Sequence, residues 1–108
     1  MNPVTSDSFD DQVRRSALPV LVDFWAPWCT RCAGMEPAVR EVATTFAGRG
    51  SVVTVDVEAH PELAAEHLVL SLPAVAFYRD GAVVRTLAGP RSAEELAAAF
   101  EEVLDGQH

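Results

Sequence analysis

The sequence predicts an α/β protein in which a central mixed sheet of four or five strands is flanked by four helices. Two observations lead to this fold class. In the first part of the chain, apolar β-rich runs alternate with helical periodicity, an order typical of parallel strands joined by right-handed crossovers. In the last third, two apolar runs flank Asp80-Gly81, which is typical of a β-hairpin, and another helical segment follows.

The predicted strands are short apolar runs rich in β-branched residues. Residues 18–24 form a nearly continuous apolar run, as expected where both faces of a sheet are covered. Only Asp23 interrupts this run. The other strands are predicted at residues 4–5, 51–57, 74–78 and 82–87.

The first two predicted helices flank the run at 18–24. The first follows residues 6–8, Ser-Asp-Ser, which are candidate N-caps. The second follows Cys29 and closes at the glycines of 48–50, with Pro37 expected to kink it. This helix carries the strongest periodicity of the chain, with apolar residues recurring on one face at Met35, Val39, Val42 and Phe46.

The other two helices have recognisable start signals. Pro61 suits the first position of the third helix. Ser92, with Glu95 three residues later, forms the capping-box pattern at the start of the fourth helix. The apolar face of that helix is formed by Leu96, Phe100, Val103 and Leu104.

Composition excludes several classes of protein. A chain of 108 residues, 49% of them hydrophobic, is expected to fold as one domain over residues 1–108. Sixteen acidic residues against eight arginines give a net charge of -8, which disfavours nucleic acid and anionic membranes as partners. No segment has the pattern of a signal peptide or a membrane span, so we expect a cytoplasmic protein.

Cys29 and Cys32 are the only cysteines, and they lie between an apolar strand and a long helix. A separation of three residues brings two Cα atoms within disulfide range over one helical turn. In the cytosol, a Cys-x-x-Cys pair is typical of redox catalysis or metal binding. A zinc site needs about two further ligands, and none of the three histidines has a matching spacing. We therefore expect redox chemistry and no metal.

The sequence resembles the thioredoxin family over essentially its whole length. Residues 22–29, Val-Asp-Phe-Trp-Ala-Pro-Trp-Cys, are similar nearly residue for residue to the strand and active-site approach of that family. The other matching positions are Cys32, the kink proline Pro37, the cis-proline loop Leu72-Pro73, the hairpin 79–81 and the last-loop glycine Gly89. The resemblance implies a thioredoxin-like fold and a thiol–disulfide oxidoreductase that reduces protein disulfides.

The resemblance also implies how the cysteines react. Cys29, at a helix N-terminus that stabilises its thiolate, is expected to attack a client disulfide. Cys32, one turn further in, then resolves the mixed disulfide. Asp23 is expected to be a buried acid below Cys32 that accepts its proton, because burial raises a carboxyl pKa. From the sequence alone, Asp23 is also compatible with a carboxylate at a frayed strand end.

Four residues are expected to form a substrate-binding rim around the cysteines: Trp28, Leu72, Pro73 and Gly89. The resemblance implies that Pro73 is a cis proline and that Leu72 presents its backbone groups to an extended client. Gly89 lets a partner approach closely. Two simpler interpretations remain open, in which Trp28 is a core aromatic and Pro73 an ordinary turn proline.

Several positions depart from the family pattern. Thr30-Arg31 stands where Gly-Pro is usual, Thr54 where many members have lysine, and Ala74 where threonine is common. Without the lysine, Asp23 is expected to be a stronger base. The Arg31 N–H and guanidinium both favour a Cys29 thiolate, which predicts a weaker reductant. We assign redox tuning to Thr30, Arg31, Thr54 and Pro73.

The family implies no bound cofactor beyond the redox-active disulfide, with NADPH acting only indirectly through a reductase. The expected partners are thioredoxin reductase or another dithiol donor, and disulfide-containing client proteins. A monomer is expected. Two alternatives stay open: a more oxidising disulfide oxidase or isomerase, and a non-catalytic binding or chaperone-like module that uses the Trp28, Pro73 and Gly89 rim.

Overall fold

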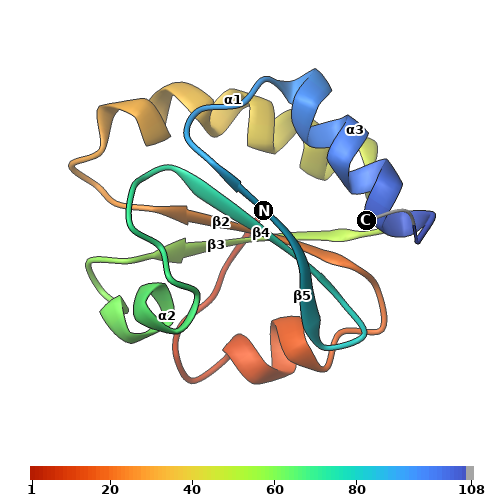
Figure 1. Cartoon of the computed structure of the whole chain (residues 1–108), viewed down its shortest axis with the longest axis horizontal. Coiled ribbons are helices and arrows are strands. Elements are labelled where there is room, and N and C mark those ends of the chain that lie inside the picture. The colour runs from red at the N-terminus through yellow and green to blue at the C-terminus, as the bar shows by residue number, and fades with distance from the viewer. Residues whose placement is uncertain (107–108) are drawn as a thin grey trace.

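The computed structural model describes residues 1–106 as a five-stranded sheet with helical elements on both faces. Figure 1 shows this arrangement. In chain order the elements are β1 (Asn2–Pro3), the π-helix η1 (Asp10–Arg14), β2 (Val20–Trp25), α1 (Thr30–Thr45), β3 (Ser51–Asp56), α2 (Pro61–Glu66), β4 (Ala74–Arg79), β5 (Ala82–Ala88) and α3 (Ala93–Leu104).

The sheet is mixed, as predicted. Its strand order is β1-β3-β2-β4-β5. β1, β3 and β2 are mutually parallel, whereas β4 runs antiparallel to β2 and forms a hairpin with β5. The central strand β2 is therefore hydrogen-bonded on both sides, which holds its C-terminal end, where Cys29 follows, in a fixed position.

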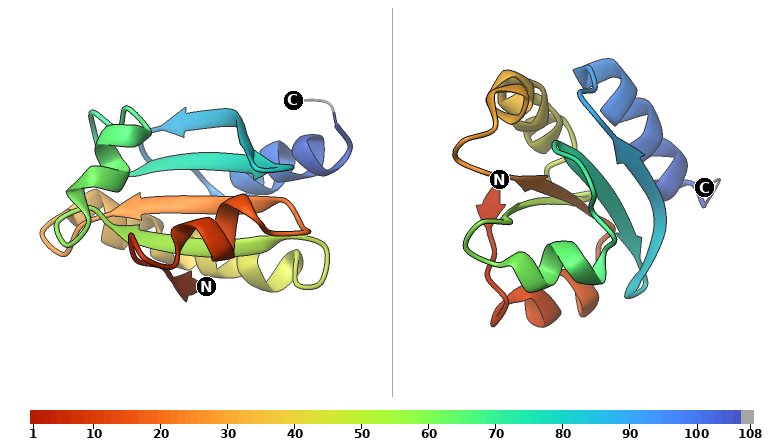
Figure 2. Two further views of the ribbon diagram at one scale, coloured as in Figure 1. Left: turned by 90° about the horizontal axis from the view of Figure 1, so that it is seen from below. Right: turned by 60° about the vertical axis from the view of Figure 1, so that its left-hand side comes forward.

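Two hydrophobic layers enclose the sheet. α1 and α3 cover one face, and η1 and α2 cover the other, as Figures 1 and 2 show from different sides. Successive β2 residues point to opposite faces, so Leu21 packs with Phe46, Phe77 and Phe100, whereas Val22 belongs to the second layer. The continuous apolar run at this strand thus reflects burial on both sides. Within residues 1–106, no helix is long and apolar enough to cross a membrane.

The N-terminal elements differ from the predicted ones. The first strand is Asn2–Pro3 and not residues 4–5, although the Val4 N–H still donates to the Thr54 carbonyl and the Val4 side chain is buried. The first helix begins after Phe9 without a side-chain cap. Ser8 does not cap it because its Oγ accepts the N–H of Thr5 and closes a turn before the helix.

The other elements agree with the predictions to within a few residues. α1 ends at Thr45, earlier than the predicted closure, and Gly48 follows in the left-handed region with φ +86°. Asp80 and Gly81 have φ +53° and +81°, the conformation of a two-residue type I′ hairpin turn. The capping box of α3 is complete: the Ser92 Oγ and the Glu95 carboxylate each accept the other residue's backbone N–H at 3.1 Å.

Two glycines provide a matched test of this packing. Gly50 lies below α3, and a Cβ added to it would lie 2.5 Å from the Cζ of Phe100. A Cβ added to Gly34, inside α1, would have no atom within 4 Å. We expect Gly50→Ala to destabilise the fold by about 1–3 kcal/mol through overpacking. Gly34→Ala should stabilise it by about 0.5–1 kcal/mol through helix propensity. Urea unfolding measures both, and equal midpoints for the two variants would contradict the described packing.

Candidate active site

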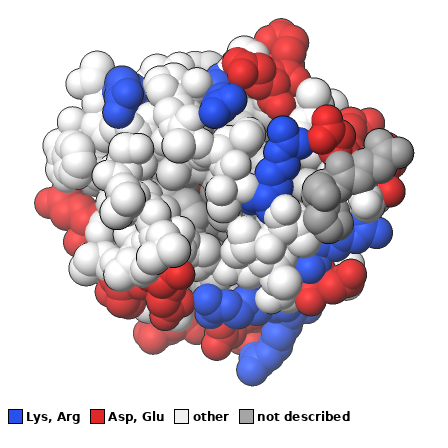
Figure 3. All heavy atoms as spheres, in the orientation of Figure 1, with Lys and Arg blue, Asp and Glu red and all other residues white. Residues whose placement is uncertain are grey.

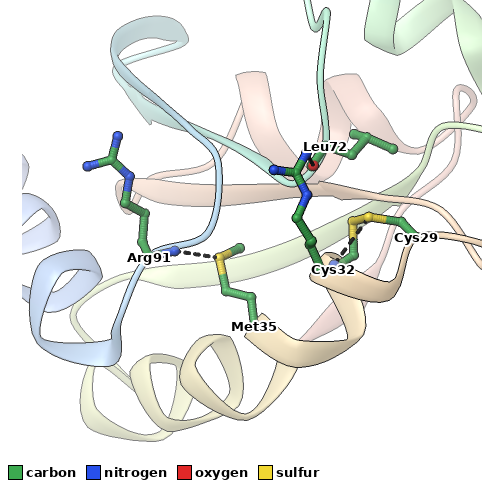
Figure 4. Close-up of a disulfide and its surroundings, with 6 residues drawn as sticks. Cys29, Cys32, Met35, Leu72 and Arg91 are labelled. Carbon is green, nitrogen blue, oxygen red and sulfur yellow. Dashed lines mark hydrogen bonds between the residues drawn. A yellow bond between two sulfur atoms is a disulfide. The ribbon is translucent and has the colours of Figure 1, made fainter.

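The two cysteines form a disulfide at the N-terminal end of α1. Cys29 is the N-cap residue, and Cys32 lies in the first turn with a Cα–Cα distance of 5.3 Å (Figure 4). The Cys32 N–H donates to the Cys29 Sγ at 3.2 Å. The positive end of the helix therefore faces the sulfur of Cys29, and this arrangement stabilises negative charge there after reduction.

Cys29 and Cys32 differ in what they face and not in depth. Cys32 was expected to lie further in than Cys29, but both residues are 7% exposed in the disulfide form. Cys29 lines an outer groove as well as a smaller cavity, whereas Cys32 lines only the smaller cavity. A partner in the groove thus meets Cys29.

Asp23 lines the smaller cavity together with both cysteines. This cavity has a volume of about 160 Å³. Asp23 is in the middle of β2, paired with Thr54 on one side and Val75 on the other, so it is not a frayed strand end. Its Oδ1 is buried and has no hydrogen-bond partner among the described residues. Burial, with a smaller contribution from Glu36, raises the pKa of Asp23 to about 7.

The neighbours of Asp23 were only partly predicted. Thr54 stands directly beside it in the parallel pairing and is half-buried, so no cation is placed on that side. Glu36 was missed. It follows Cys32 by four residues, and this spacing puts both residues on the same face of α1, so the sequence did contain a signal for it. Glu36 lines the cavity and acts on Asp23 as a like charge.

The outer groove has a volume of about 440 Å³. Trp28 lines it and is 67% exposed, which excludes a core role for this side chain. The Arg31 Nη2 donates to the Leu72 carbonyl at 2.7 Å across the groove. Leu70, another residue that the sequence analysis missed, lies along it and is 96% exposed. No helical or strand periodicity marked Leu70, because it belongs to an irregular loop.

The loops that carry Pro73 and Gly89 are joined by hydrogen bonding. The Leu72–Pro73 peptide bond is cis. The Gly89 N–H donates to the Pro73 carbonyl at 2.9 Å, with Gly89 at φ +80°. The backbone N–H of Arg91 donates to the Met35 Sδ at 3.4 Å, which ties this loop to α1 (Figure 4). The fold thus brings together the residues to which the sequence assigned a rim.

In the disulfide form, Arg31 contacts the Leu72 carbonyl and not the Cys29 sulfur. In the disulfide form, the backbone donor to the Cys29 Sγ is Cys32 and not Arg31. The guanidinium reaches the Leu72 carbonyl, 41 residues away in sequence. The side chain extends across the groove because that carbonyl lies within its reach. Thr30 begins α1, lines the same groove and is exposed.

Among the described residues, no histidine lines the groove or the cavity. His67 packs between Phe9, Phe24 and Tyr78, and its ring nitrogens contact the Leu63 carbonyl and the Tyr78 hydroxyl. His67 therefore lies at the edge of the core. Within residues 1–106, no cluster of three or more His, Cys, Asp or Glu side chains is arranged to hold a metal ion.

Comparisons with known proteins agree with this geometry. A family described as Thioredoxin matches residues 1–102. The chain is 36% identical to "Thioredoxin 1" of Synechococcus elongatus, over 94% of each chain. It is 37% identical to "Thioredoxin" of Mycolicibacterium smegmatis, over 94% of this chain and 92% of that one. It is 39% identical to "Thioredoxin" of Streptomyces clavuligerus, over 82% and 81%.

Asp23→Asn should show the cost of burying the carboxylate. The pKa of Asp23 is about 7 in the folded protein and near 3.9 in the unfolded chain. Between these two pH values, the folded protein keeps the proton that the unfolded chain has lost. The free energy of unfolding therefore falls as the pH rises from about 4 to about 7. Below about pH 4, the variant and wild type should have the same free energy of unfolding. Above pH 7, that of the variant should be higher by up to about 4 kcal/mol. Urea unfolding against pH measures this difference. Exposed Asp7, changed to Asn, is the control, and a pH-independent gain at Asp23 would contradict the raised pKa.

Thr54→Lys should lower the pKa of Asp23. An ammonium group beside the carboxyl favours its charged form, with an expected decrease of about one unit or more. The Asp23 side-chain carboxyl carbon can be titrated by NMR in the oxidised protein, where no thiol titrates nearby. Thr54→Val is the neutral control. An unchanged pKa in the lysine variant would show that position 54 does not act on Asp23.

Proposed function

The chain belongs to the thioredoxin family, and from this premise we propose that it reduces protein disulfides with Cys29 as the attacking thiolate. It is a protein-disulfide oxidoreductase with the thioredoxin-like α/β fold. One observation carries the assignment of roles: the first turn of α1 donates an N–H to the Cys29 sulfur, which also faces the outer groove. A thiolate at Cys29 is thus both stabilised and within reach of a client.

The proposed reaction proceeds in two exchanges. The Cys29 thiolate attacks one sulfur of the client disulfide, forms a mixed disulfide and releases a client thiolate, which is protonated. Cys32 then passes its proton to Asp23 and attacks the Cys29 sulfur, so the second client thiolate leaves. The client gains two electrons, and the Cys29–Cys32 disulfide is restored.

Asp23 suits the role of proton acceptor in the second exchange. Its carboxyl lines the same cavity as Cys32 and keeps one oxygen free of hydrogen bonds within the described part of the chain. A pKa of about 7 lets this group accept a proton in the mixed disulfide and release it after turnover at neutral pH. Direct transfer and transfer through one water both fit this role.

Client binding is assigned to the rim of Trp28, Leu72, Pro73 and Gly89. The exposed indole offers apolar area. The backbone of Leu72 can pair with an extended segment of the client. Because Gly89 lacks a Cβ, a client can approach the loop joined to Pro73 closely.

The remaining assignments follow from the family. Thioredoxin reductase or another dithiol donor restores the dithiol, so NADPH acts only through a reductase and no cofactor is bound. We propose a cytoplasmic monomer that acts on disulfide-containing proteins and not on nucleic acid or membranes. Tuning of the redox potential by Thr30, Arg31, Thr54 and Pro73 stays a prediction.

Cysteine variants test this function. Insulin reduction with dithiothreitol, and with thioredoxin reductase plus NADPH, should proceed with wild type. Cys29→Ser should lose the enzyme-dependent rate, because the remaining thiol, Cys32, does not line the groove that a client enters. Cys32→Ser should lose turnover but accumulate a mixed disulfide with the client, detectable by mass spectrometry. Turnover by Cys29→Ser would overturn the assignment. So would a client adduct that is trapped on Cys32 in Cys29→Ser while none is trapped on Cys29 in Cys32→Ser.

A further inference from the structure

Arg31 differs from the other arginines of this acidic chain. Among residues 1–106, it alone of the eight arginines has no carboxylate oxygen within 4.0 Å of its guanidinium nitrogens. The seven paired arginines are Arg14, Arg15, Arg40, Arg49, Arg79, Arg85 and Arg91. With sixteen acidic residues in the chain, an arginine left without a carboxylate at this position calls for an explanation.

The surroundings of Arg31 are largely uncharged. Its guanidinium lies in the outer groove, whose other lining residues are all uncharged: Trp28, Cys29, Thr30, Val57, Ala64, Val69, Leu70, Ser71 and Leu72. In Figure 3, the surface over the loops at the left of the molecule is mainly white, and acidic side chains gather around its margin and on the opposite side. The groove therefore presents one localised positive charge within an apolar surface.

The partner that Arg31 now has is a weak one for a guanidinium. It donates a single hydrogen bond, from Nη2 to the Leu72 carbonyl at 2.7 Å. A carboxylate accepts two parallel hydrogen bonds from a guanidinium and adds charge attraction, so it binds more strongly than one neutral carbonyl. An arriving carboxylate can thus draw Arg31 away from Leu72.

We propose that Arg31 determines client specificity by binding an acidic side chain next to the client's reactive cysteine. The carboxylate takes over the guanidinium and frees the Leu72 carbonyl to accept a backbone N–H from the same extended segment. In the absence of such a client, Arg31 occupies that carbonyl. Clients with a neutral residue beside the cysteine must displace Arg31 without the compensating ion pair.

This inference rests on the proposed function, because it concerns recognition at the same groove. The test uses two symmetric disulfide-linked peptides that differ only in the residues on both sides of cysteine, Glu in one and Gln in the other. The measured quantity is the ratio of kcat/KM for the Glu peptide to that for the Gln peptide. Glutamate also alters the reactivity of the peptide thiol and is repelled by the protein's net charge, so the ratio is compared between protein variants.

The variants separate the local charge from the net charge. Arg31→Gln removes the guanidinium, and Arg31→Lys keeps a charge without the planar fork. Arg15→Gln is the matched control. Arg15 is the exposed C-cap residue of η1, is paired with Asp11, does not line the groove and carries the same charge. At low ionic strength we expect Arg31→Gln to lower the ratio about threefold. The ratio for Arg31→Lys should lie between those of wild type and Arg31→Gln. The ratio for Arg15→Gln should equal that of wild type.

Salt and binding measurements complete the test. The difference between wild type and Arg31→Gln should shrink as salt is raised, since an exposed ion pair is screened. Binding of the corresponding single-chain peptides, with serine in place of cysteine, is followed by tryptophan fluorescence. The Glu peptide should bind more tightly than the Gln peptide to wild type without any turnover. Equal ratios in wild type and Arg31→Gln, or an equal loss in Arg15→Gln, would overturn the inference. Absent turnover with the binding preference retained would instead overturn the proposed reduction and support this inference.

Discussion

The hydrogen bond from the Cys32 N–H to the Cys29 Sγ is the interaction on which the rest of the site depends. It exists because α1 begins directly at the disulfide and because packing holds the helix there. Met35, Val39 and Val42 bury one face of α1 against the sheet and α3. β2, paired on both sides, ends a few residues before Cys29. The positive end of the helix is thus held at the sulfur that a client meets.

A second constraint is the burial of Asp23 beside the disulfide. Asp23 belongs to a strand buried on both faces, and its Oδ1 has no partner among the described residues. A buried carboxyl without partners favours its neutral form, and the like charge of Glu36 acts in the same direction. The same burial that disfavours ionisation at neutral pH also gives the group the pKa of a proton acceptor. Stability and proton transfer therefore oppose each other at this residue.

Charge is distributed unevenly over the molecule. The acidic chain pairs its arginines with carboxylates over most of the described surface, but at the groove it offers a guanidinium held only by the Leu72 carbonyl. The surrounding side chains are apolar or neutral, with Trp28 and Leu70 strongly exposed. Recognition here combines apolar area, backbone pairing and one positive charge, and the charge is the component that distinguishes one client from another.

The sequence by itself determined the features that depend on neighbouring residues: the hairpin at Asp80-Gly81, the capping box at Ser92 and the strand–disulfide–helix unit around Cys29. Each follows from local dihedral preferences, local hydrogen bonds or short-range periodicity. Family resemblance added Asp23 and the rim. Only the tertiary structure decided that Arg31 reaches Leu72 and that Glu36 acts on Asp23. Arg31 reaches a backbone carbonyl 41 residues away, and Glu36 acts on a carboxyl of another element. The spacing of Cys32 and Glu36 places both on one face of α1, but only the packing of the elements sets which groups that face meets.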